Sequence, residues 1–214
     1  MLPRRRTTLL ILCALCALLV GCDAAPKYAA LPPGASVLAL GDSVTYGTGA
    51  AAGEDFPSRL AVLSRWEVHN YGVPGDTTAG AKTRLAAALD ETQPKLVILE
   101  IGGNDFLRRR PEAEVKQNIR NMLQTIKRKG ITVLLVAVPR FSLMGAAVGS
   151  LPDAELYAEL AREENVPLVP ETFADVLSAP ALKSDQIHPN AAGYRQLAEG
   201  IATILVDTGL LAKR

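Results

Sequence analysis

Short apolar runs alternate with longer amphipathic stretches along most of the chain, and this pattern constrains the fold more than any other feature. Runs such as KLVILEI and ITVLLVAV are nearly continuous in apolar residues, as expected for strands that helices cover on both faces. Repeating strand and helix units of this kind are typical of an α/β domain built on a parallel sheet. The expected strands are residues 36–40, 66–71, 95–101, 131–138 and 165–169. The expected helices are residues 54–64, 78–89, 112–129, 153–164 and 191–206.

The residues at the ends of these helices agree with the pattern. Pro111 suits a first helical turn, Gly130 suits a helix end, and Asp153 is expected to cap the helix that follows it. The chain shows no internal repeat and no second block of different composition. The sequence therefore predicts a single doubly wound α/β domain with a five-stranded parallel sheet.

The first 21 residues have the layout of a bacterial export signal. Three arginines, at positions 4 to 6, precede a mostly apolar run that ends in small residues. This run is too short to remain as a span of a hydrocarbon core about 30 Å thick. The ending L-V-G-C resembles the lipobox of bacterial lipoproteins, in which cleavage before Cys22 frees that residue for lipid attachment. The alternative is ordinary secretion, with Cys22 left as a free thiol.

The predicted processing divides the chain into a signal at residues 1–21, a lipidated Cys22 with a flexible tether at 22–35, and a folded domain at 36–214. The tether is predicted because these residues are rich in alanine and proline and lack periodicity. Cys13 and Cys16 fall inside the signal, so the mature chain would hold one cysteine and no internal disulfide. The expected location is the periplasmic face of the bacterial cell envelope, with a lipid anchor in the membrane.

The charge of the chain is close to balanced. The signal holds three of the 23 basic residues and none of the 22 acidic residues, so the mature chain has two more acidic than basic groups. This balance argues against a nucleic-acid partner or a polybasic membrane surface. The mature length is sufficient to bury a core without metal or disulfide support.

Three polar, glycine-containing segments follow predicted strands, where ligands bind in open parallel sheets, and a fourth polar segment lies in a late loop. These segments are GDS at 41–43, HNYGVPGDT at 69–77, IGGND at 101–105 and the late loop SDQIHPN at 184–190. Because the carboxyl ends of parallel strands share one edge of the sheet, we expect the four segments to lie together there.

Ser43 and His188 are the candidate nucleophile and base of this edge. A serine hydroxyl needs a base within hydrogen-bond reach, and that base needs an acceptor to orient it. Asp185 precedes His188 by three residues, so its carboxylate can accept from one ring nitrogen while the other faces Ser43. A simple turn or capping role for Asp185 is the alternative. The other histidine of the mature chain, His69, lies in an alternating strand, which favours a structural role.

Acyl transfer also requires donors for the developing oxyanion. The backbone N–H groups of Ser43 and Gly75 and the side-chain amide of Asn104 are the candidates. Glycine lets the backbone approach a ligand closely, and a neutral amide can donate without a charge penalty. The Gly-Gly-Asn segment could equally be only a turn.

The ordered blocks GDS, GDT with its preceding Asn70 and Pro74, GGND, and DxxHP resemble the four consensus blocks of the GDSL or SGNH hydrolases. The resemblance spans about Val37 to the last predicted helix and is closest to the thioesterase I, lysophospholipase L1 and arylesterase branch. It implies a flavodoxin-like, three-layer α/β/α fold and no cofactor or metal. It also implies Ser43 as nucleophile, His188 as base and Asp185 as its partner, with oxyanion donors at the three positions already named.

The expected activity is hydrolysis of carboxylic esters or thioesters through an acyl-enzyme on Ser43, by a monomer. The expected substrates are small acyl esters, thioesters or lysophospholipids. Two alternatives are a carbohydrate O-acetyl esterase on the same scaffold and a non-catalytic, ligand-binding envelope lipoprotein. A metal-dependent hydrolase built from Asp42, Asp185 and His188 is a further alternative, although the sequence lacks a dense cluster with ligand spacing.

Two segments near the blocks bear on specificity. The run Arg108 to Arg110 could favour an anionic group such as a lipid phosphate, or could be a solvated lead-in to a helix. Three apolar residues of a later loop could line an acyl or aryl pocket or pack on the core: Phe141, Leu143 and Met144.

Asp42 could brace the serine loop or cap a helix. Glu100, at a buried strand end, requires a partner or a raised pKa and is assigned no chemistry.

Overall fold

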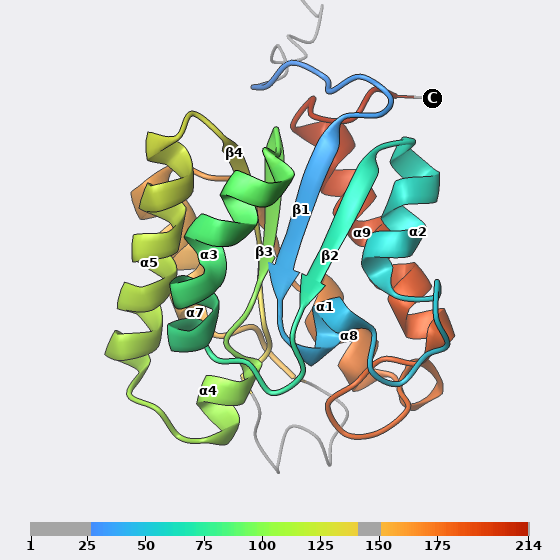
Figure 1. Cartoon of the computed structure of the whole chain (residues 1–214). Coiled ribbons are helices and arrows are strands. Elements are labelled where there is room, and N and C mark those ends of the chain that lie inside the picture. The colour runs from blue at the N-terminus through green and yellow to red at the C-terminus, as the bar shows by residue number, and fades with distance from the viewer. Residues whose placement is uncertain (1–26, 141–150, 214) are drawn as a thin grey trace, which may run out of the picture.

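The structure is a computed structural model of the whole chain, and it describes residues 27–140 and 151–213 (Figure 1). Several sequence predictions lie outside the described residues. They are the signal at residues 1–21, the lipidation site Cys22, and the loop residues Phe141, Leu143 and Met144.

A five-stranded parallel sheet forms the centre of the molecule, as the sequence predicts. Its strands are β1 (Ser36–Gly41), β2 (Glu67–Gly72), β3 (Leu96–Glu100), β4 (Thr132–Val136) and β5 (Leu168–Val169). The order across the sheet is β2-β1-β3-β4-β5, and all neighbouring pairs are parallel. The direction of winding therefore reverses beside β1, so that β1 and β3 are neighbours in the sheet although β2 lies between them in the chain. An open α/β sheet binds its ligands at such a position.

Helices cover both faces of the sheet and complete the three-layer architecture (Figure 1). One layer holds α3 (Thr78–Thr92), α5 (Glu112–Arg128) and α7 (Glu155–Glu164). The other holds α2 (Phe56–Ser64), α8 (Thr172–Ser178) and α9 (Ala191–Asp207). Strands β1, β3 and β4 are almost entirely buried between the layers, which explains their nearly continuous apolar sequences.

Short elements that the sequence pattern missed lie at the carboxyl edge of the sheet or near it. They are α1 (Ser43–Tyr46), α4 (Gly103–Leu107) and the 3-10 helix η1 (Pro180–Leu182). The helix α8 was also missed. Each has at most seven residues, too few to show the periodicity on which helix prediction depends.

The predicted capping role of Asp153 is wrong. The N-cap of α7 is Ala154, and no side chain caps this helix. The Asp153 carboxylate instead accepts a hydrogen bond of 2.7 Å from the backbone N–H of Glu171, across the loop that follows β5. The carboxylate is therefore engaged by this loop and not by the first turn of α7.

Residues 28–35 pack against the domain, in contrast to the flexible tether predicted for 22–35. The N–H of Tyr28 donates to the carbonyl of Thr208, and the N–H of Leu31 donates to the carbonyl of Leu210. Both side chains are partly buried against the core. The folded unit therefore begins before residue 36, because the segment pairs with the chain that follows α9. Among the described residues, no helix combines the length and the apolar character needed to cross a membrane.

Candidate active site

The candidate site lies where β1 and β3 end side by side. In the sheet register Gly41 is opposite Glu100, so the segments that follow these residues leave the sheet next to each other. The first continues through Asp42 into α1, and the second continues through Gly102 into α4. Two of the four polar segments are thus brought together directly by strand pairing.

Gly41 allows the chain to turn tightly from β1 into α1. A Cβ at this position would overlap both the hydroxyl of Thr45 and the carbonyl oxygen of Glu100. The absence of a side chain lets the first turn of α1 lie directly against the end of β3. Ser43 is the first residue of α1, and Asp42 is its N-cap, accepting from the N–H of Val44 at 3.0 Å.

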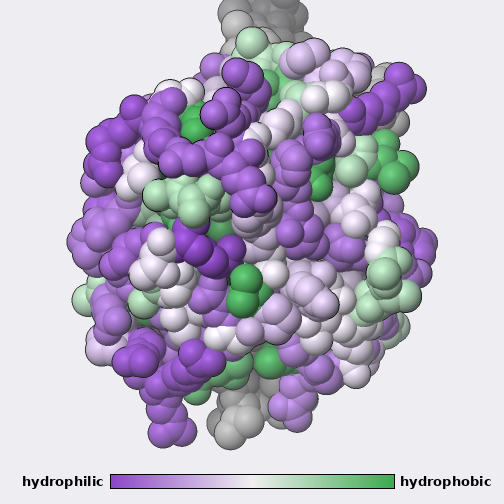
Figure 2. Space-filling model, in the orientation of Figure 1, coloured by the Kyte–Doolittle hydropathy of each residue, from purple (hydrophilic) through white to green (hydrophobic). Residues whose placement is uncertain are grey.

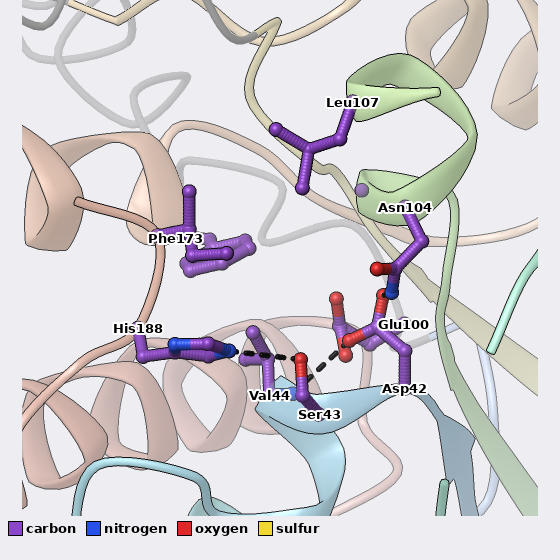
Figure 3. A pocket seen from close by; sticks show the side chains of 10 residues that line it. Asp42, Ser43, Val44, Glu100, Asn104, Leu107, Phe173 and His188 are labelled. Atoms are coloured by element: carbon purple, nitrogen blue, oxygen red, sulfur yellow. Dashed lines mark hydrogen bonds between the residues drawn. The ribbon is translucent and has the colours of Figure 1, made fainter. Parts of the chain in front are cut away.

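Ser43, His188 and Asp185 form a continuous chain of hydrogen bonds (Figure 3). Nε2 of His188 lies 3.0 Å from Oγ of Ser43, and Nδ1 of His188 lies 2.7 Å from Oδ2 of Asp185. Ser43 and His188 are 145 positions apart in the sequence. The predicted meeting of hydroxyl and imidazole at one sheet edge is confirmed, and its geometry is that of a nucleophile, a base and an orienting carboxylate.

The loop before α9 holds Asp185 and His188 in this arrangement. Oδ1 of Asp185 accepts from the backbone N–H groups of Ile187 and His188, at 2.8 and 2.9 Å, while Oδ2 faces the imidazole. Partial burial acts to raise the pKa of Asp185, but hydrogen bonds from the His188 ring and from the two N–H groups outweigh it and lower the pKa. The carboxylate therefore stays ionised beside the imidazole. The cap of α9 is not Asp185 but Asn190, which accepts from the N–H groups of Ala192 and Gly193.

Asn104 lies on the other side of Ser43, in the pocket shown in Figure 3. Its Nδ2 donates to Oδ2 of Asp42 at 3.2 Å, so the amide orientation is fixed by the residue next to the serine. Burial raises the pKa of Asp42 to about 6, against the lowering effect of its hydrogen bonds from Val44 and Asn104. Asp42 thus connects the serine turn to the candidate oxyanion donor, in addition to capping α1.

Gly75 lies in the turn after β2, where its φ of 79° is in the left-handed region that favours glycine. Its carbonyl oxygen accepts a hydrogen bond of 2.9 Å from the guanidinium of Arg108, the residue after α4. Gly75 is not among the residues that line the pocket around Ser43. The structure therefore brings the Gly75 turn to the end of α4, beside the site, through Arg108.

Glu100 is fully buried at the end of β3 and borders the same pocket. Its Oε2 accepts a hydrogen bond of 2.8 Å from the hydroxyl of Thr45 on α1. Burial and then the negative charge of Asp42 raise its pKa well above the usual range. Two acidic side chains, Asp42 and Glu100, thus lie beneath the serine and the amide.

Four apolar side chains line the rest of the pocket and form its apolar wall. They are Val44, Leu107, Phe173 and Ile187, which come from α1, α4, α8 and the Asp185 loop. In Figure 3, Leu107 and Phe173 stand across the pocket from Ser43 and His188. The site therefore combines a polar reaction centre with an apolar surface suited to an acyl or aryl group.

Other residues singled out from the sequence lie elsewhere. His69 is in β2, where its nearest charged partner is Glu67 at 3.9 Å, and it does not line the pocket. Arg109 and Arg110 are exposed, and within residues 27–140 and 151–213 neither side chain donates a hydrogen bond. In the same ranges, no three His, Cys, Asp or Glu residues are grouped as metal ligands, so the ligand set of the metal alternative is not assembled.

Sequence reasoning left the role of Asp42 open between bracing the serine loop and capping a helix, and the structure confirms the cap. It assigned no chemistry to Glu100, left the role of Arg108 open, and did not identify Phe173. No pattern linked Phe173 to the site, because α8 was not predicted. The partner of Arg108 is a backbone carbonyl 33 residues away, and such a contact leaves no trace in the sequence.

Comparisons with known proteins agree with this geometry. Residues 39–196 match the GDSL-like Lipase/Acylhydrolase family. The chain is 32% identical over 170 residues to thioesterase 1/protease 1/lysophospholipase L1 of Escherichia coli strain K12, covering 78% of this chain and 81% of that protein. It is 31% identical over 176 residues to an arylesterase of Vibrio mimicus, covering 79% and 88%.

The fold is also shared with a solved structure. The crystal structure of TesA matches with a TM-score of 0.69 and 31% identity, over 79% of this chain and 97% of that one. These relatives favour an esterase over the carbohydrate-specific and non-catalytic alternatives. The chain belongs to the GDSL-like lipase/acylhydrolase family and is a serine hydrolase of ester bonds.

Proposed function

We propose that this hydrolase cleaves carboxylic esters and thioesters with an apolar acyl or aryl group, of the thioesterase, lysophospholipase or arylesterase type, through an acyl-enzyme on Ser43. The observation that carries the proposal is the chain of hydrogen bonds from Asp185 through His188 to Ser43, at 2.7 and 3.0 Å. All three hydrogen-bonded residues belong to one polypeptide, so the site needs no second copy of the protein, which supports a monomeric enzyme. On the face seen in Figure 2, hydrophilic side chains predominate and hydrophobic ones are scattered, which also supports a monomer.

In the first half of the reaction, Oγ of Ser43 attacks the carbonyl carbon while Nε2 of His188 takes the hydroxyl proton. The carbonyl oxygen becomes an oxyanion, for which the donors are the N–H of Ser43, the N–H of Gly75 and Nδ2 of Asn104. The tetrahedral intermediate then collapses. The bond to the leaving oxygen or sulfur breaks, and His188 returns the proton to the leaving group.

In the second half, a water molecule replaces the leaving group. His188 takes a proton from the water, whose oxygen attacks the acyl carbon, and the same donors stabilise the second oxyanion. Collapse breaks the bond to Ser43, and the proton passes from His188 to Oγ. Throughout, the ionised Asp185 stabilises the imidazolium and holds the ring with Nε2 toward the serine.

The apolar wall supports a hydrophobic substrate. Three of the four large apolar side chains that are exposed in the described residues lie at the carboxyl edge of the sheet: Tyr46, Val73 and Leu107. Leu107 is 46% exposed although it borders the pocket, so it can cover an acyl chain that enters there. A panel of esters and thioesters from acetyl to palmitoyl tests this, and we expect kcat/KM to rise as the chain reaches Leu107 and Phe173.

Ser43→Ala is the direct test of the reaction. We expect a loss of at least about a thousandfold in kcat toward p-nitrophenyl butyrate, with an unchanged circular dichroism spectrum. Ser36→Ala is the matched control. Ser36 is the first residue of β1, at the end of the strand that is far from Ser43, and its hydroxyl donates to the carbonyl of Thr92. Retention of full activity by Ser43→Ala would refute the acyl-enzyme.

We propose that a lipid on Cys22 anchors the enzyme to the periplasmic face of a bacterial cell-envelope membrane. The L-V-G-C ending of the apolar signal supports the proposal. The test is metabolic labelling with a radioactive fatty acid, followed by membrane fractionation. We expect label and enzyme in the membrane for the native chain, and a soluble, unlabelled enzyme for Cys22→Ala. An unlabelled native chain would contradict the anchor.

An anchor at Cys22 would leave the active site facing away from the membrane that holds it. Lys27 bonds to Asn165, which ends α7 just before β5, so the described chain starts at the edge of the sheet opposite Ser43 (Figure 1). Five peptide units separate Cys22 from Lys27 and span at most about 18 Å. The six residues of β1 alone cover about 20 Å. The pocket mouth is therefore farther from Lys27 than these five peptide units can span, which supports substrates that reach the site from solution, including dispersed lysophospholipids.

Lengthening the connection tests this orientation. In vesicles that carry the lipidated enzyme, we expect a long-chain ester embedded in the same bilayer to be cleaved slowly and a dissolved p-nitrophenyl ester at full rate. Inserting about 30 Gly and Ser residues between Ala25 and Pro26 should raise only the first rate. Cys22→Ala with the same insertion is the control. Equal cleavage of the embedded ester with and without the insertion would contradict the orientation.

A further inference from the structure

Glu100 is an acidic side chain buried in the core beneath the active site, where a negative charge is costly. Its exposed fraction is 0%. Among the described residues, Oε1 has no hydrogen-bond partner, and the one side chain that bonds to Oε2 is the neutral hydroxyl of Thr45. An ionised carboxylate in such a place, without a cation or a full set of donors, is strongly disfavoured relative to the same group in water. A protonated carboxyl avoids that cost.

The surroundings of Glu100 add more negative than positive charge. The acidic side chain whose charge acts on Glu100 is Asp42. The other titratable or charged side chains around this pair are Asp76, Arg84, Asp105, Tyr157, His188 and Tyr194. The guanidinium of Arg84 is engaged by Asp76 and by the carbonyls of Gly41 and Tyr71. His188 acts on Asp42 from the side of the serine. Arg84 and His188 are thus both occupied elsewhere, and neither compensates a charge on Glu100.

Asp42 is the member of this acidic pair that has donors on both of its oxygens, whereas the hydrogen bonds that lower the pKa of Glu100 leave its Oε1 without a partner among the described residues. It accepts from the N–H of Val44 through Oδ1 and from the amide of Asn104 through Oδ2. Two neighbouring carboxyl groups that cannot both ionise share one proton. The proton stays on the carboxyl group whose surroundings stabilise a negative charge least. That member is Glu100.

We propose that Glu100 carries a proton at neutral pH and is a positioning residue of the hydrolase. Its neutral carboxyl bonds to Thr45, which fixes α1 and the attacking Ser43 against the end of β3. It also leaves a single negative charge on Asp42, which orients the Asn104 amide toward the oxyanion. The inference rests on the proposed function of this site, and it assigns Glu100 no contact with the substrate.

A consequence is that ionisation of Glu100 disturbs the site from below. A second negative charge against Asp42 repels it, weakens its hydrogen bonds to Val44 and Asn104, and shifts the donor away from the oxyanion. We therefore expect kcat to fall at alkaline pH while KM changes little, because the ground-state contacts of the acyl group are with the apolar wall. The pKa of Glu100 is raised by burial and by the charge of Asp42. If Glu100 keeps its proton at neutral pH as proposed, this loss falls on the alkaline side.

Two substitutions at position 100 separate this role from simple packing. Glu100→Ala removes the bond to Thr45, and we expect kcat to fall at least about tenfold. Glu100→Gln keeps a neutral group of the same shape that can still accept from Thr45, so it should restore kcat to within about threefold of the native value. Because an amide cannot ionise, Glu100→Gln should also abolish the part of the alkaline loss that Glu100 causes in the native enzyme.

The proton itself can be observed in the folded native enzyme. An infrared difference spectrum, native minus Glu100→Gln at pH 7.5, should show the C=O band of a protonated carboxyl. An ionised carboxylate band instead, or an unchanged alkaline limb in Glu100→Gln, would overturn the proposal. If Glu100→Gln does not fold, the pH titration of the native infrared spectrum decides in the same way. Loss of activity in Ser43→Ala is independent of these readouts, so failure of this inference is distinguishable from failure of the proposed function.

Discussion

Nδ2 of Asn104 donates a hydrogen bond of 3.2 Å to Oδ2 of Asp42, across 62 positions of the chain. The other oxygen of Asp42 caps α1 at Val44, the residue after the nucleophile. One carboxylate thus holds the serine turn and the oxyanion amide together. We predict that Asp42→Ala lowers kcat by about ten- to a hundredfold, less than or equal to the effect of deleting one oxyanion donor, with little change in KM.

Steady-state kinetics with p-nitrophenyl butyrate check this prediction. The matched control is Asp90→Ala. This substitution removes an exposed carboxylate that pairs with Lys129, and neither residue lines the pocket. An Asp42→Ala enzyme with native kcat would show that the amide is oriented by something else.

Acid should inactivate the enzyme partly through Asp42. Its pKa is about 6, so it is ionised above that value and becomes neutral below it. Protonation weakens its acceptance of the hydrogen bonds from Val44 and Asn104, and we therefore predict that kcat falls as the pH drops through about 6. Asp42→Asn cannot titrate, so its kcat should be lower at pH 8 and less dependent on pH between 5 and 7. An acid limb of native steepness in Asp42→Asn would count against a contribution from Asp42.

Asp185 supports the base by orientation and charge. Its lowered pKa keeps it ionised beside His188 at neutral pH. We predict that Asp185→Asn lowers kcat by about a thousand- to ten-thousandfold, because the amide can impose the wrong tautomer on the ring. Circular dichroism should be unchanged, because Asp185 lies in an exposed loop. A loss of less than tenfold would mean that His188 is oriented by another acceptor.

Arg108 offers two predictions that exclude each other. Its bond to the Gly75 carbonyl points to positioning of the Gly75 N–H, in which case Arg108→Met lowers kcat about tenfold on neutral esters and leaves KM unchanged. Recognition of an anionic substrate instead predicts a raised KM for lysophospholipids and native kinetics on neutral esters. We expect the first result. Arg110→Met is the control, since Arg110 is exposed and lies at the same end of α4.

Asp105 should matter for stability rather than for the reaction. It is buried, and its two oxygens accept from the N–H and the hydroxyl of Thr78, both at 2.8 Å, at the first residue of α3. Asp105→Ala leaves these donors unpaired, so we predict a loss of about 2 to 4 kcal/mol in the free energy of unfolding. Urea denaturation measures it, and a change below 0.5 kcal/mol, the range of ordinary surface substitutions, would contradict the prediction.

The sequence was sufficient to predict the sheet, because β1, β3 and β4 are buried on both faces and their apolar runs are unmistakable. The strand β2 was recognised from its alternation, and β5, of two residues, from the short run NVPLV. The sequence also identified Ser43, Asp185 and His188, because short polar blocks after strands must share one edge. Their roles in catalysis stay predictions until variants are measured.

The rest depends on contacts that no local pattern encodes. Glu100 reaches Thr45 over 55 positions, and Arg108 reaches a carbonyl over 33, so neither partner could be named from spacing. The predicted cap of α7 was wrong because Asp153 accepts from the N–H of a residue distant in the sequence. The predicted tether was too long because Tyr28 and Leu31 pair with the segment after α9. In each case tertiary structure decided between local alternatives.

The central claim is that Ser43 forms a covalent acyl-enzyme with the help of His188. Mass spectrometry of the intact protein after treatment with a fluorophosphonate tests it most directly. We predict a single adduct in the native enzyme, located on the peptide that contains Ser43, a much slower adduct in His188→Ala, and none in Ser43→Ala. An adduct on another residue, or an unlabelled native enzyme that hydrolyses esters at full rate, would contradict the account.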